Sequence, residues 1–275
     1  MKLGLIQTTH SPMCNFLSRE FPFSPGECAA MQERQVQQNL SLLSAASGKG
    51  YDLLVTTECI NYIRLGPDTP TDISLSPELD CSHVEALSHS TREAESYLVA
   101  GFGYREGSQA YNAALVFDRR GNLLHRYHKI HLAGDENRIF TPGQDFCVVE
   151  GDFGTFGVCI CWDMQFPETA RTLALGGASL VVCPTWGWEA DLYGKARAYE
   201  NRIFAAAAMA VPAWGLIQSP RTPSSLISPM GEILAMAGTT DSMLLSCRCP
   251  LEQAAESKKM RLDGRRPQLY KALTK

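Results

Sequence analysis

The sequence lacks the features that mark membrane-spanning, exported and nucleic-acid-binding proteins. Its longest apolar windows, such as residues 203–214, are well short of the roughly 20 residues that a helix needs to cross a bilayer. The first seven residues contain one cation and a short apolar run, which is too little for a signal peptide. A formal net charge of -4 and a sequence pI near 5.9 argue against the basic surface of a nucleic-acid binder. We therefore expect a cytoplasmic protein with neither a membrane nor a nucleic acid as its partner.

The ten cysteines lack the spacing of a metal site and the context of a disulfide scaffold. Structural zinc sites use four ligands in pairs that are usually spaced C-x2-C, whereas this chain has two C-x-C pairs, Cys159 with Cys161 and Cys247 with Cys249. A chain of 275 residues buries enough core to fold without cross-links. We expect reduced thiols and no bound metal, and alternation along a strand would place both members of each pair on one face.

Short apolar runs alternate with longer periodic segments along the chain, without an internal repeat or a low-complexity linker. Runs bounded by Gly, Pro or Asp predict strands at residues 3–7, 53–56, 98–102, 113–117, 156–160 and 180–183. Helical periodicity predicts helices at residues 25–47, 82–96, 166–175 and 189–208. This alternation indicates an α/β fold.

The strands are expected to form mixed sheets that are covered on both faces. Residues 118–122 have the composition of a tight turn and predict a hairpin, so the sheet is not purely parallel. The buried run at residues 180–183 needs cover on both sides, which helices supply on one side and a second sheet supplies on the other.

We expect one domain over residues 1–250 and a C-terminal tail over residues 251–275. The tail is polar and basic, so it is either solvated or in contact with another subunit. Residues 11–27 contain three prolines and are interpreted as an insertion that forms either a lid or an interface.

Three reactive side chains lie at the ends of predicted strands or in strongly apolar surroundings. Glu58 ends the buried run that begins at residue 53, and Lys129 lies within Tyr-His-Lys-Ile-His-Leu. Cys161 lies on a turn between a strand and a helix, where the amides of the helix N-terminus favour a thiolate. Taken singly, a glutamate at the end of a strand is more often simply solvated. A lysine among apolar residues more often covers apolar surface with its stem.

Taken together and in this order, the three residues resemble the nitrilase superfamily of carbon-nitrogen hydrolases, with Cys161 in Cys-Trp-Asp-Met-Gln-Phe-Pro-Glu. The resemblance covers nearly the whole chain. Further matching fragments are Tyr111-Asn112-Ala113, Glu136 in Asp-Glu-Asn-Arg-Ile-Phe-Thr-Pro-Gly, Pro184-Thr185-Trp186, residues 197–201 and residues 228–232. The resemblance implies a four-layer α-β-β-α sandwich with two mixed sheets, and subunits that pair into a homodimer or a higher homo-oligomer.

The resemblance also implies a catalytic triad of Glu58, Lys129 and Cys161. Cys161 would attack the carbonyl carbon of an amide while Glu58 acts as general base. Lys129 and the backbone amide of Trp162 would stabilise the oxyanion, and water activated by Glu58 would hydrolyse the thioester. Glu136 would orient Lys129 and hold its charge. This chemistry implies neither a metal nor an organic cofactor.

The substrate is less well defined by the sequence. Relatives that recognise carboxylates often carry an arginine shortly after the nucleophile, where this chain has Met164 and Gln165. Tyr111, Asn112 and Trp186 are the candidate substrate-binding residues. Aromatic side chains here either line an apolar pocket or fill the core between the sheets.

The favoured function is hydrolysis of a small amide or N-carbamoyl compound, with release of ammonia or an amine. A nitrilase would use the same triad on a nitrile carbon, and Cys161-Trp162 is shared with true nitrilases, whereas Asp163 is more typical of amidases. A non-catalytic binding protein that retains the fold is the alternative from another class. Because the polar site residues are all present, we expect an enzyme.

Overall fold

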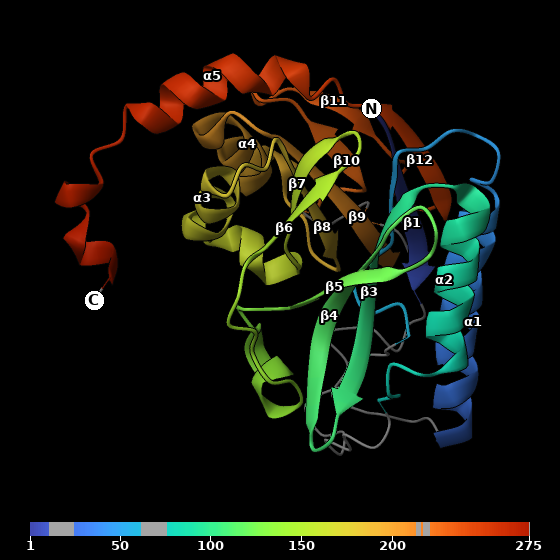
Figure 1. Ribbon diagram of the computed structural model, residues 1–275. Coiled ribbons are helices and arrows are strands. Elements are labelled where there is room, and N and C mark those ends of the chain that lie inside the picture. The colour runs from blue at the N-terminus through green and yellow to red at the C-terminus, as the bar shows by residue number, and fades with distance from the viewer. Residues whose placement is uncertain (11–24, 62–75, 213–215, 217–220, 275) are drawn as a thin grey trace.

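A computed structural model describes residues 1–10, 25–61, 76–212, 216 and 221–274, and Figure 1 shows strands flanked by helices. One half of the sheet contains β1 (Lys2–His10), β2 (Leu53–Val55), β3 (Tyr97–Glu106), β4 (Gln109–Phe117), β5 (Leu123–His128) and β12 (Met243–Arg248). The other half contains β6 (Cys147–Gly151), β7 (Gly154–Val158), β8 (Leu180–Thr185), β9 (Phe204–Pro212), β10 (Ser225–Ile227) and β11 (Ile233–Met236). Each strand that the sequence predicted is present, with ends that differ by a few residues.

The strands follow the order β5-β4-β3-β2-β1-β9-β8-β7-β6, with β12 beside β1 and β10 beside β9. Strands β1, β2 and β3 are parallel, as are β7, β8 and β9, whereas β3, β4 and β5 are antiparallel, which confirms the mixed pairing and the hairpin at residues 118–122. The two halves join where Thr8 of β1 pairs with Ala210 of β9. The fold is mixed α/β with a nearly closed sheet, and a sandwich of two separate sheets stays a prediction.

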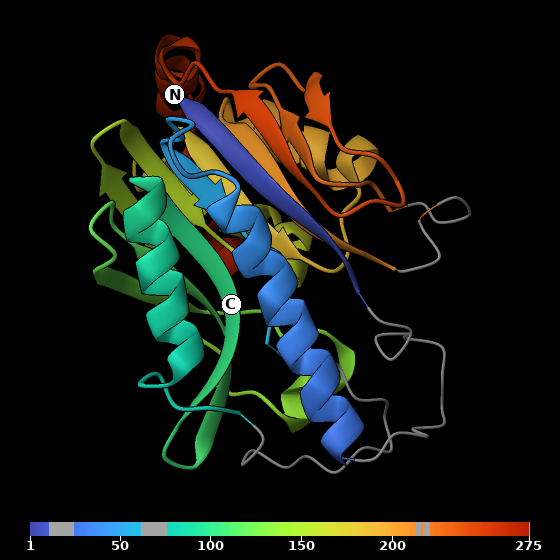
Figure 2. The same cartoon turned by 90° about the vertical axis from the view of Figure 1, so that its right-hand side faces the viewer.

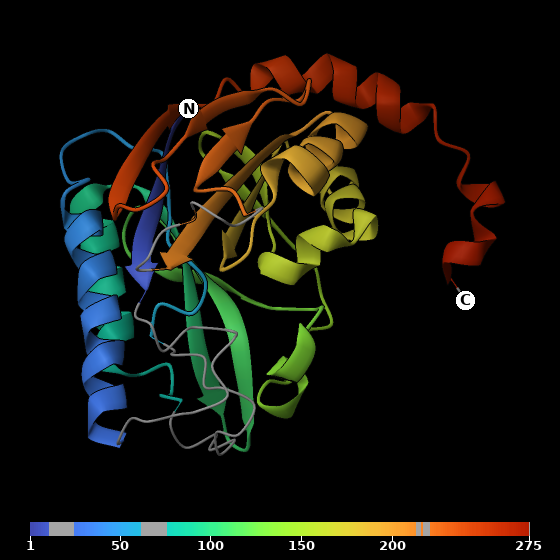
Figure 3. The ribbon, with the colours of Figure 1, turned by 180° about the vertical axis from the view of Figure 1, so that it is seen from behind.

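Helices cover the two halves of the sheet from opposite sides. In Figure 2, α1 (Pro25–Ser44) and α2 (Ser82–Ala94) lie side by side, and their Leu43 and Leu87 share a hydrophobic cluster with β3. In Figure 3, α3 (Pro167–Leu175) and α4 (Lys195–Asn201) lie on the other side, where Leu173 packs in a cluster with β8. A third cluster contains residues from both halves of the sheet, including Val99 and Val182. These contacts bury most apolar side chains of the strands.

The helix predicted at residues 189–208 is wrong in its second half. The helix α4 ends at Asn201, the next residue Arg202 has a φ of 53°, and strand β9 begins at Phe204. Along β9, Ala206 lies in the cluster that both halves of the sheet share, whereas Ala207 lies in the cluster beneath α3 and α4. The run is alanine-rich, so its composition favours a helix, but burial on both faces of a central strand overrides that preference.

The C-terminal tail begins as a packed helix. Helix α5 (Glu252–Asp263) buries Ala254, and the ammonium of Lys258 donates hydrogen bonds to the carbonyls of Gly177 (2.7 Å) and Ala178 (3.1 Å). Figure 1 shows α5 along the outside of the molecule and the C-terminus extended away from it. A contact between this tail and another subunit stays a prediction.

The proposed insertion at residues 11–27 lies largely outside the described residues, because the description resumes where α1 begins. Across the described part of the chain, we find no helix with the length and apolar character that a membrane span needs.

Candidate active site

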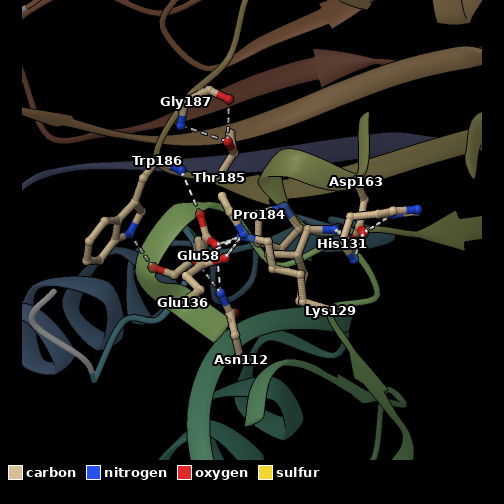
Figure 4. A network of polar contacts seen from close by, with 12 residues as sticks. Glu58, Asn112, Lys129, His131, Glu136, Asp163, Pro184, Thr185, Trp186 and Gly187 are labelled. Carbon is tan, nitrogen blue, oxygen red and sulfur yellow. Dashed lines mark hydrogen bonds and ion pairs between the residues drawn. The ribbon is translucent and has the colours of Figure 1, made fainter. Parts of the chain in front are cut away.

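Glu58 follows strand β2 and is held by contacts from three other parts of the chain (Figure 4). One carboxylate oxygen accepts hydrogen bonds from Asn112 Nδ2 and Lys129 Nζ, both at 2.8 Å, and the other accepts the backbone N–H of Trp186 at 3.0 Å. The indole N–H of Trp186 also donates to the Glu58 carbonyl at 2.6 Å. Only 3% of Glu58 is exposed. The contacts therefore fix a buried carboxylate in one orientation.

The segment that carries Glu58 lies directly against strand β3. A Cβ atom at Gly101 would come within 2.2 Å of the Thr57 carbonyl oxygen and 2.7 Å of the Glu58 Cα. Only glycine allows two backbones to approach this closely. Glycine at this position of β3 is therefore part of how the sequence places the carboxylate.

Lys129 lies between two buried carboxylates. Its backbone N–H donates to the Asn112 carbonyl at 2.8 Å, which ties it to β4, and its ammonium contacts Glu58 at 2.8 Å and Glu136 at 2.8 Å. Glu136 also accepts the backbone N–H of Ala133 at 2.7 Å. The structure thus brings Glu58 together with Lys129 and Glu136, as the resemblance implied, although Glu58 lies 71 residues before Lys129.

The charges in this cluster determine its protonation. Burial alone lowers the pKa of Lys129, but the Glu58 and Glu136 carboxylates outweigh it and hold that pKa well above its usual value. Burial raises the pKa of Glu136, with Lys129 opposing and Glu58 reinforcing the shift. Lys129 therefore remains a cation throughout the physiological range.

Cys161 begins a short 3-10 helix, Cys161–Gln165, that follows strand β7 and leads to α3. Its φ of 44° lies in the left-handed region, which marks a sharp strand-to-helix turn. Burial, followed by the Glu58 charge, raises the pKa of the Cys161 thiol to about 12, although Lys129 opposes the shift. The sequence had suggested a thiolate at this turn, but burial and the carboxylates favour a resting thiol. Attack by this residue therefore requires a base.

We expect the alkylation of Cys161 by iodoacetamide to report this raised pKa. Because the thiolate is the reactive form, the rate should rise about tenfold for each pH unit between pH 7 and pH 10. The Glu58→Gln variant removes a charge that raises this pKa, so its profile should shift to lower pH. Mass spectrometry of the peptide that contains Cys161 measures the rate, with Cys161→Ala as the blank. A plateau reached below pH 9 in the wild type would contradict a raised pKa.

Asp163 holds the turn that carries Cys161. One of its oxygens accepts the Ile160 N–H (2.9 Å) and the Tyr127 hydroxyl (2.7 Å), and the other accepts both the backbone N–H (2.9 Å) and the ring Nδ1 (2.8 Å) of His131. Asp163 is fully buried. Sequence reasoning noted Asp163 only as a residue typical of amidases and missed this anchoring contact, because Tyr127 and His131 lie over 30 residues away.

Replacing Asp163 with asparagine should destabilise the protein. An amide nitrogen cannot accept hydrogen bonds, so two of the four donors would lose their acceptor. Each buried donor left unpaired should lower the free energy of unfolding by about 1–3 kcal/mol. Urea unfolding of Asp163→Asn measures this loss, and Asp145→Asn at an exposed site is the matched control. Equal stability of the two variants would show that Asp163 does not anchor the turn.

A cavity of about 320 Å³ opens above these groups. It is lined by Glu58, Lys129, Ala133, Gly134, Glu136, Cys161, Trp162, Gln165, Trp186, Gly187, Glu189, Tyr193 and Arg221. The Trp162 side chain is 42% exposed, whereas Trp186 is almost buried. All the predicted catalytic residues therefore face one small space, which suits a small substrate.

The predicted substrate-binding residues occupy three different places. Trp186 lines the cavity and also clamps Glu58. Asn112 lies behind the carboxylates and donates to Glu58. Tyr111 does not appear among the described residues that line the cavity; its ring stacks on His128 at 3.9 Å, and its hydroxyl donates to Gln109 at 2.9 Å. A substrate contact of Tyr111 stays a prediction.

The cysteines and acidic residues do not assemble a metal site in the described part of the chain, where no group of three or more His, Cys, Asp or Glu has a suitable arrangement. The cysteines with described side chains form no disulfide with one another. The polar groups that face the cavity are those suited to acid–base and nucleophilic chemistry.

The chain is similar in sequence to several known proteins. A hydrolase of Pseudomonas protegens is 37% identical over 188 residues, which cover 63% of this chain and 65% of that protein, so the match spans less than two thirds of this relative. A probable nitrilase of Schizosaccharomyces pombe is 36% identical over 188 residues, covering 64% of this chain and 68% of its own. An omega-amidase of Xenopus tropicalis is 29% identical over 255 residues, which cover 82% of this chain and 86% of that protein.

Among solved structures, a mutant of a Nesterenkonia amidase from the nitrilase superfamily superposes with a TM-score of 0.77. It is 24% identical, and the match covers 99% of this chain and 97% of that one, so the fold is shared. A family model described as carbon-nitrogen hydrolase matches residues 24–259, which is most of the chain. The match confirms the resemblance that the motifs indicated. The chain belongs to the carbon-nitrogen hydrolase family.

Proposed function

We propose that the chain is an amidase that hydrolyses a small amide or N-carbamoyl compound through a thioester on Cys161. The observation that carries the proposal is the grouping of Cys161 with the buried Glu58, Lys129 and Glu136 around one cavity. A nucleophile, a base and a fixed cation are the parts that amide hydrolysis needs. The family membership and the omega-amidase relative support the same reaction type.

In the proposed reaction, Glu58 takes the thiol proton as the Cys161 sulfur bonds to the carbonyl carbon. The carbonyl oxygen becomes an oxyanion, which collapses as Glu58 returns its proton to the leaving nitrogen and the carbon–nitrogen bond breaks. Ammonia or an amine departs and leaves a thioester. Glu58 then takes a proton from water, whose oxygen attacks the thioester carbon. As the carbon–sulfur bond breaks, Glu58 passes this proton to the Cys161 sulfur, so the acid and the free thiol form and Glu58 returns to its carboxylate.

The proposed role of Lys129 follows from its surroundings. An ammonium has three N–H groups, and its two carboxylate partners can occupy two of them, which leaves one for the developing oxyanion. Because the cation is held before the substrate binds, little reorganisation is needed in the transition state. The backbone N–H of Trp162, which follows the nucleophile, is the proposed second donor.

The proposal is tested by ammonia release screened across primary amides, N-carbamoyl compounds and nitriles. Release from amides or N-carbamoyl compounds is the expected result. Because one relative is a probable nitrilase, nitrile hydrolysis is the second candidate function. Ammonia release from nitriles alone would favour a nitrilase. No release from any compound would favour a non-catalytic binding protein.

The oligomeric state and the order of the helix and sheet layers are also part of the proposal. We infer a homodimer or a higher homo-oligomer, and four layers in the order α-β-β-α, as the nitrilase resemblance implies. The hydrophobic cluster shared by both halves of the sheet supports the layering. Light scattering on the intact chain measures the mass, and a monomer would contradict the proposed assembly.

A further inference from the structure

Thr185, the last residue of strand β8, lies next to the nucleophile Cys161. Strands β7 and β8 are parallel with Val158 opposite Val182, and the Cys159 N–H continues the pairing by donating to the Val182 carbonyl at 3.1 Å. Three residues beyond Val158 and Val182, the same offset reaches Cys161 and Thr185. The Thr185 side chain is fully buried and hydrogen-bonds with the Cys161 thiol. The reaction proposed above gives this hydroxyl no role.

The Thr185 hydroxyl also closes the turn that follows β8 (Figure 4). It donates to the Gly187 carbonyl at 2.7 Å and accepts the Gly187 N–H at 2.9 Å. The Tyr193 hydroxyl donates to the same carbonyl at 2.9 Å. A carbonyl oxygen has two lone pairs, so each hydroxyl can occupy one of them. If the Thr185 hydroxyl turned away, the Gly187 carbonyl would therefore still be paired.

A threonine hydroxyl has a single proton, which serves one acceptor at a time. Two acceptors lie within its reach, the Gly187 carbonyl and the Cys161 sulfur. The sulfur of a neutral thiol is a weak acceptor, so the carbonyl holds the proton in the resting state. Hydrogen bonds to ionised groups are stronger than those between neutral groups. Negative charge on the Cys161 sulfur therefore favours rotation of the hydroxyl toward it.

We propose that Thr185 is a catalytic residue whose hydroxyl donates to the Cys161 sulfur when that sulfur gains negative charge, while Tyr193 keeps the Gly187 carbonyl paired. This inference rests on the proposed amidase reaction and adds a donor to it. The sulfur gains charge twice, first as its proton moves to Glu58 during attack and again as the carbon–sulfur bond of the thioester breaks. In both steps the hydroxyl keeps its own proton and donates only a hydrogen bond, so the proton transfers through Glu58 are unchanged.

The groups around the sulfur act on its ionisation in different directions. Burial, Glu58 and Glu136 raise the pKa of the Cys161 thiol, whereas Lys129 and the hydrogen bond with Thr185 lower it. Other titratable side chains near the sulfur, which burial keeps neutral by raising the pKa of each, are Cys59, Cys159 and Tyr193. Loss of the Thr185 donor should therefore raise the pKa of Cys161, and loss of the Glu58 charge should lower it.

Alkylation of Cys161 by iodoacetamide tests the donor without any substrate. Thr185→Val keeps the shape of the side chain and removes the hydroxyl, so the pH profile should shift upward and the rate at pH 9 should fall about tenfold. Thr185→Ser should restore most of the wild-type rate. The matched control is Thr91→Val, which removes a buried hydroxyl that donates to the Leu87 carbonyl within α2 and should leave the profile unchanged.

The direction of the shift separates a donor to the sulfur from a purely structural role. Thr185→Val also removes the acceptor of the Gly187 N–H, next to the Trp186 N–H that holds Glu58. If the variant only loosened this turn, Glu58 would move away from the sulfur and the profile would shift downward, as in Glu58→Gln. A downward shift in Thr185→Val, or no shift, would therefore overturn the inference.

Tyr193→Phe tests the sharing of the Gly187 carbonyl without changing Thr185. The carbonyl then keeps the Thr185 hydroxyl as its donor, so the hydroxyl should turn to the sulfur less readily and the profile should again shift upward. The two effects should not add in a double variant with Thr185→Val, because both act through the same hydrogen bond. Full additivity would contradict the sharing.

Turnover gives the size of the effect in the reaction. For an amide that the wild type hydrolyses, Thr185→Val should lower kcat about 10- to 100-fold with little change in KM, since Thr185 is not among the described residues that line the cavity. Unchanged kcat in folded Thr185→Val would overturn the catalytic role. If the wild type hydrolyses no amide while the alkylation profile shifts as expected, the proposed amidase function fails and the hydrogen bond to the sulfur stands.

Discussion

Replacing Cys161 with alanine is expected to reduce ammonia release from every amide substrate by about 10⁴-fold or more. The sulfur is the only protein atom in the proposed reaction that bonds to the substrate carbon, so its removal eliminates the covalent route. The fold should survive, because Cys161 is only partly buried at the cavity and alanine tolerates the same turn about as well as cysteine does. Steady-state ammonia release measures the first effect, and thermal unfolding measures the second.

The control for this variant is Cys159→Ala, in the same C-x-C pair. Cys159 is fully buried in the cluster beneath α3 and α4, away from the cavity lining. Its loss should lower the melting temperature slightly while turnover persists. Continued turnover in Cys161→Ala, at a rate near that of the wild type, would contradict the assignment of the nucleophile.

Replacing Lys129 with methionine is expected to damage both turnover and stability. Loss of one preorganised donor to the oxyanion should cost about 10²–10³ in rate. The substitution also leaves Glu58 and Glu136 buried and adjacent without their shared cation, and breaking a buried ion pair in this way costs about 3–5 kcal/mol. Denaturant unfolding and ammonia release measure the two losses separately.

A double variant separates the two effects of Lys129. In Lys129→Met combined with Glu136→Gln, one of the facing carboxylates is neutral, so much of the lost stability should return. Turnover should not return, because the cation that stabilises the oxyanion is still missing. If Lys129→Met alone turns over normally, the lysine has only a structural role.

The sequence predicted most of the framework because local patterns determine it. The runs at residues 53–56 and 180–183 are buried on both faces, and each became a strand. The reactive residues Glu58 and Cys161 follow such strands, which explains why their positions could be predicted. Residues 204–208 were predicted as helix because alanine is a good helix former, and only the tertiary packing on both sides of β9 decides otherwise.

The contacts that orient the catalytic groups could not be predicted in the same way. Trp186 clamps Glu58 from 128 residues away, and Asp163 anchors the Cys161 turn through His131. Arg221 and Glu189 reach the cavity from segments without a recognisable motif. Local sequence carries no signal for such pairs, because their proximity depends on how β8 and β9 pack beside β1.

The direction of the Cys161 pKa shift is a further property of the site that could not be predicted from the local sequence. The position of Cys161 before a helix suggested a thiolate, but burial, followed by the nearby Glu58 charge, raises the pKa of the thiol to about 12. Only the folded arrangement shows that two carboxylates lie near the sulfur. The consequence is mechanistic, since a resting thiol makes Glu58 necessary as a base.

Partitioning of the acyl group to hydroxylamine tests the thioester on Cys161 most directly. A small primary amide is turned over in the presence of hydroxylamine, which competes with water for the acyl group, and the hydroxamate is measured beside ammonia. Hydroxamate is expected from the wild type, together with an acyl mass on the Cys161 peptide after acid quench, and neither product is expected from Cys161→Ala. Undiminished hydroxamate formation by Cys161→Ala would contradict a thioester on Cys161.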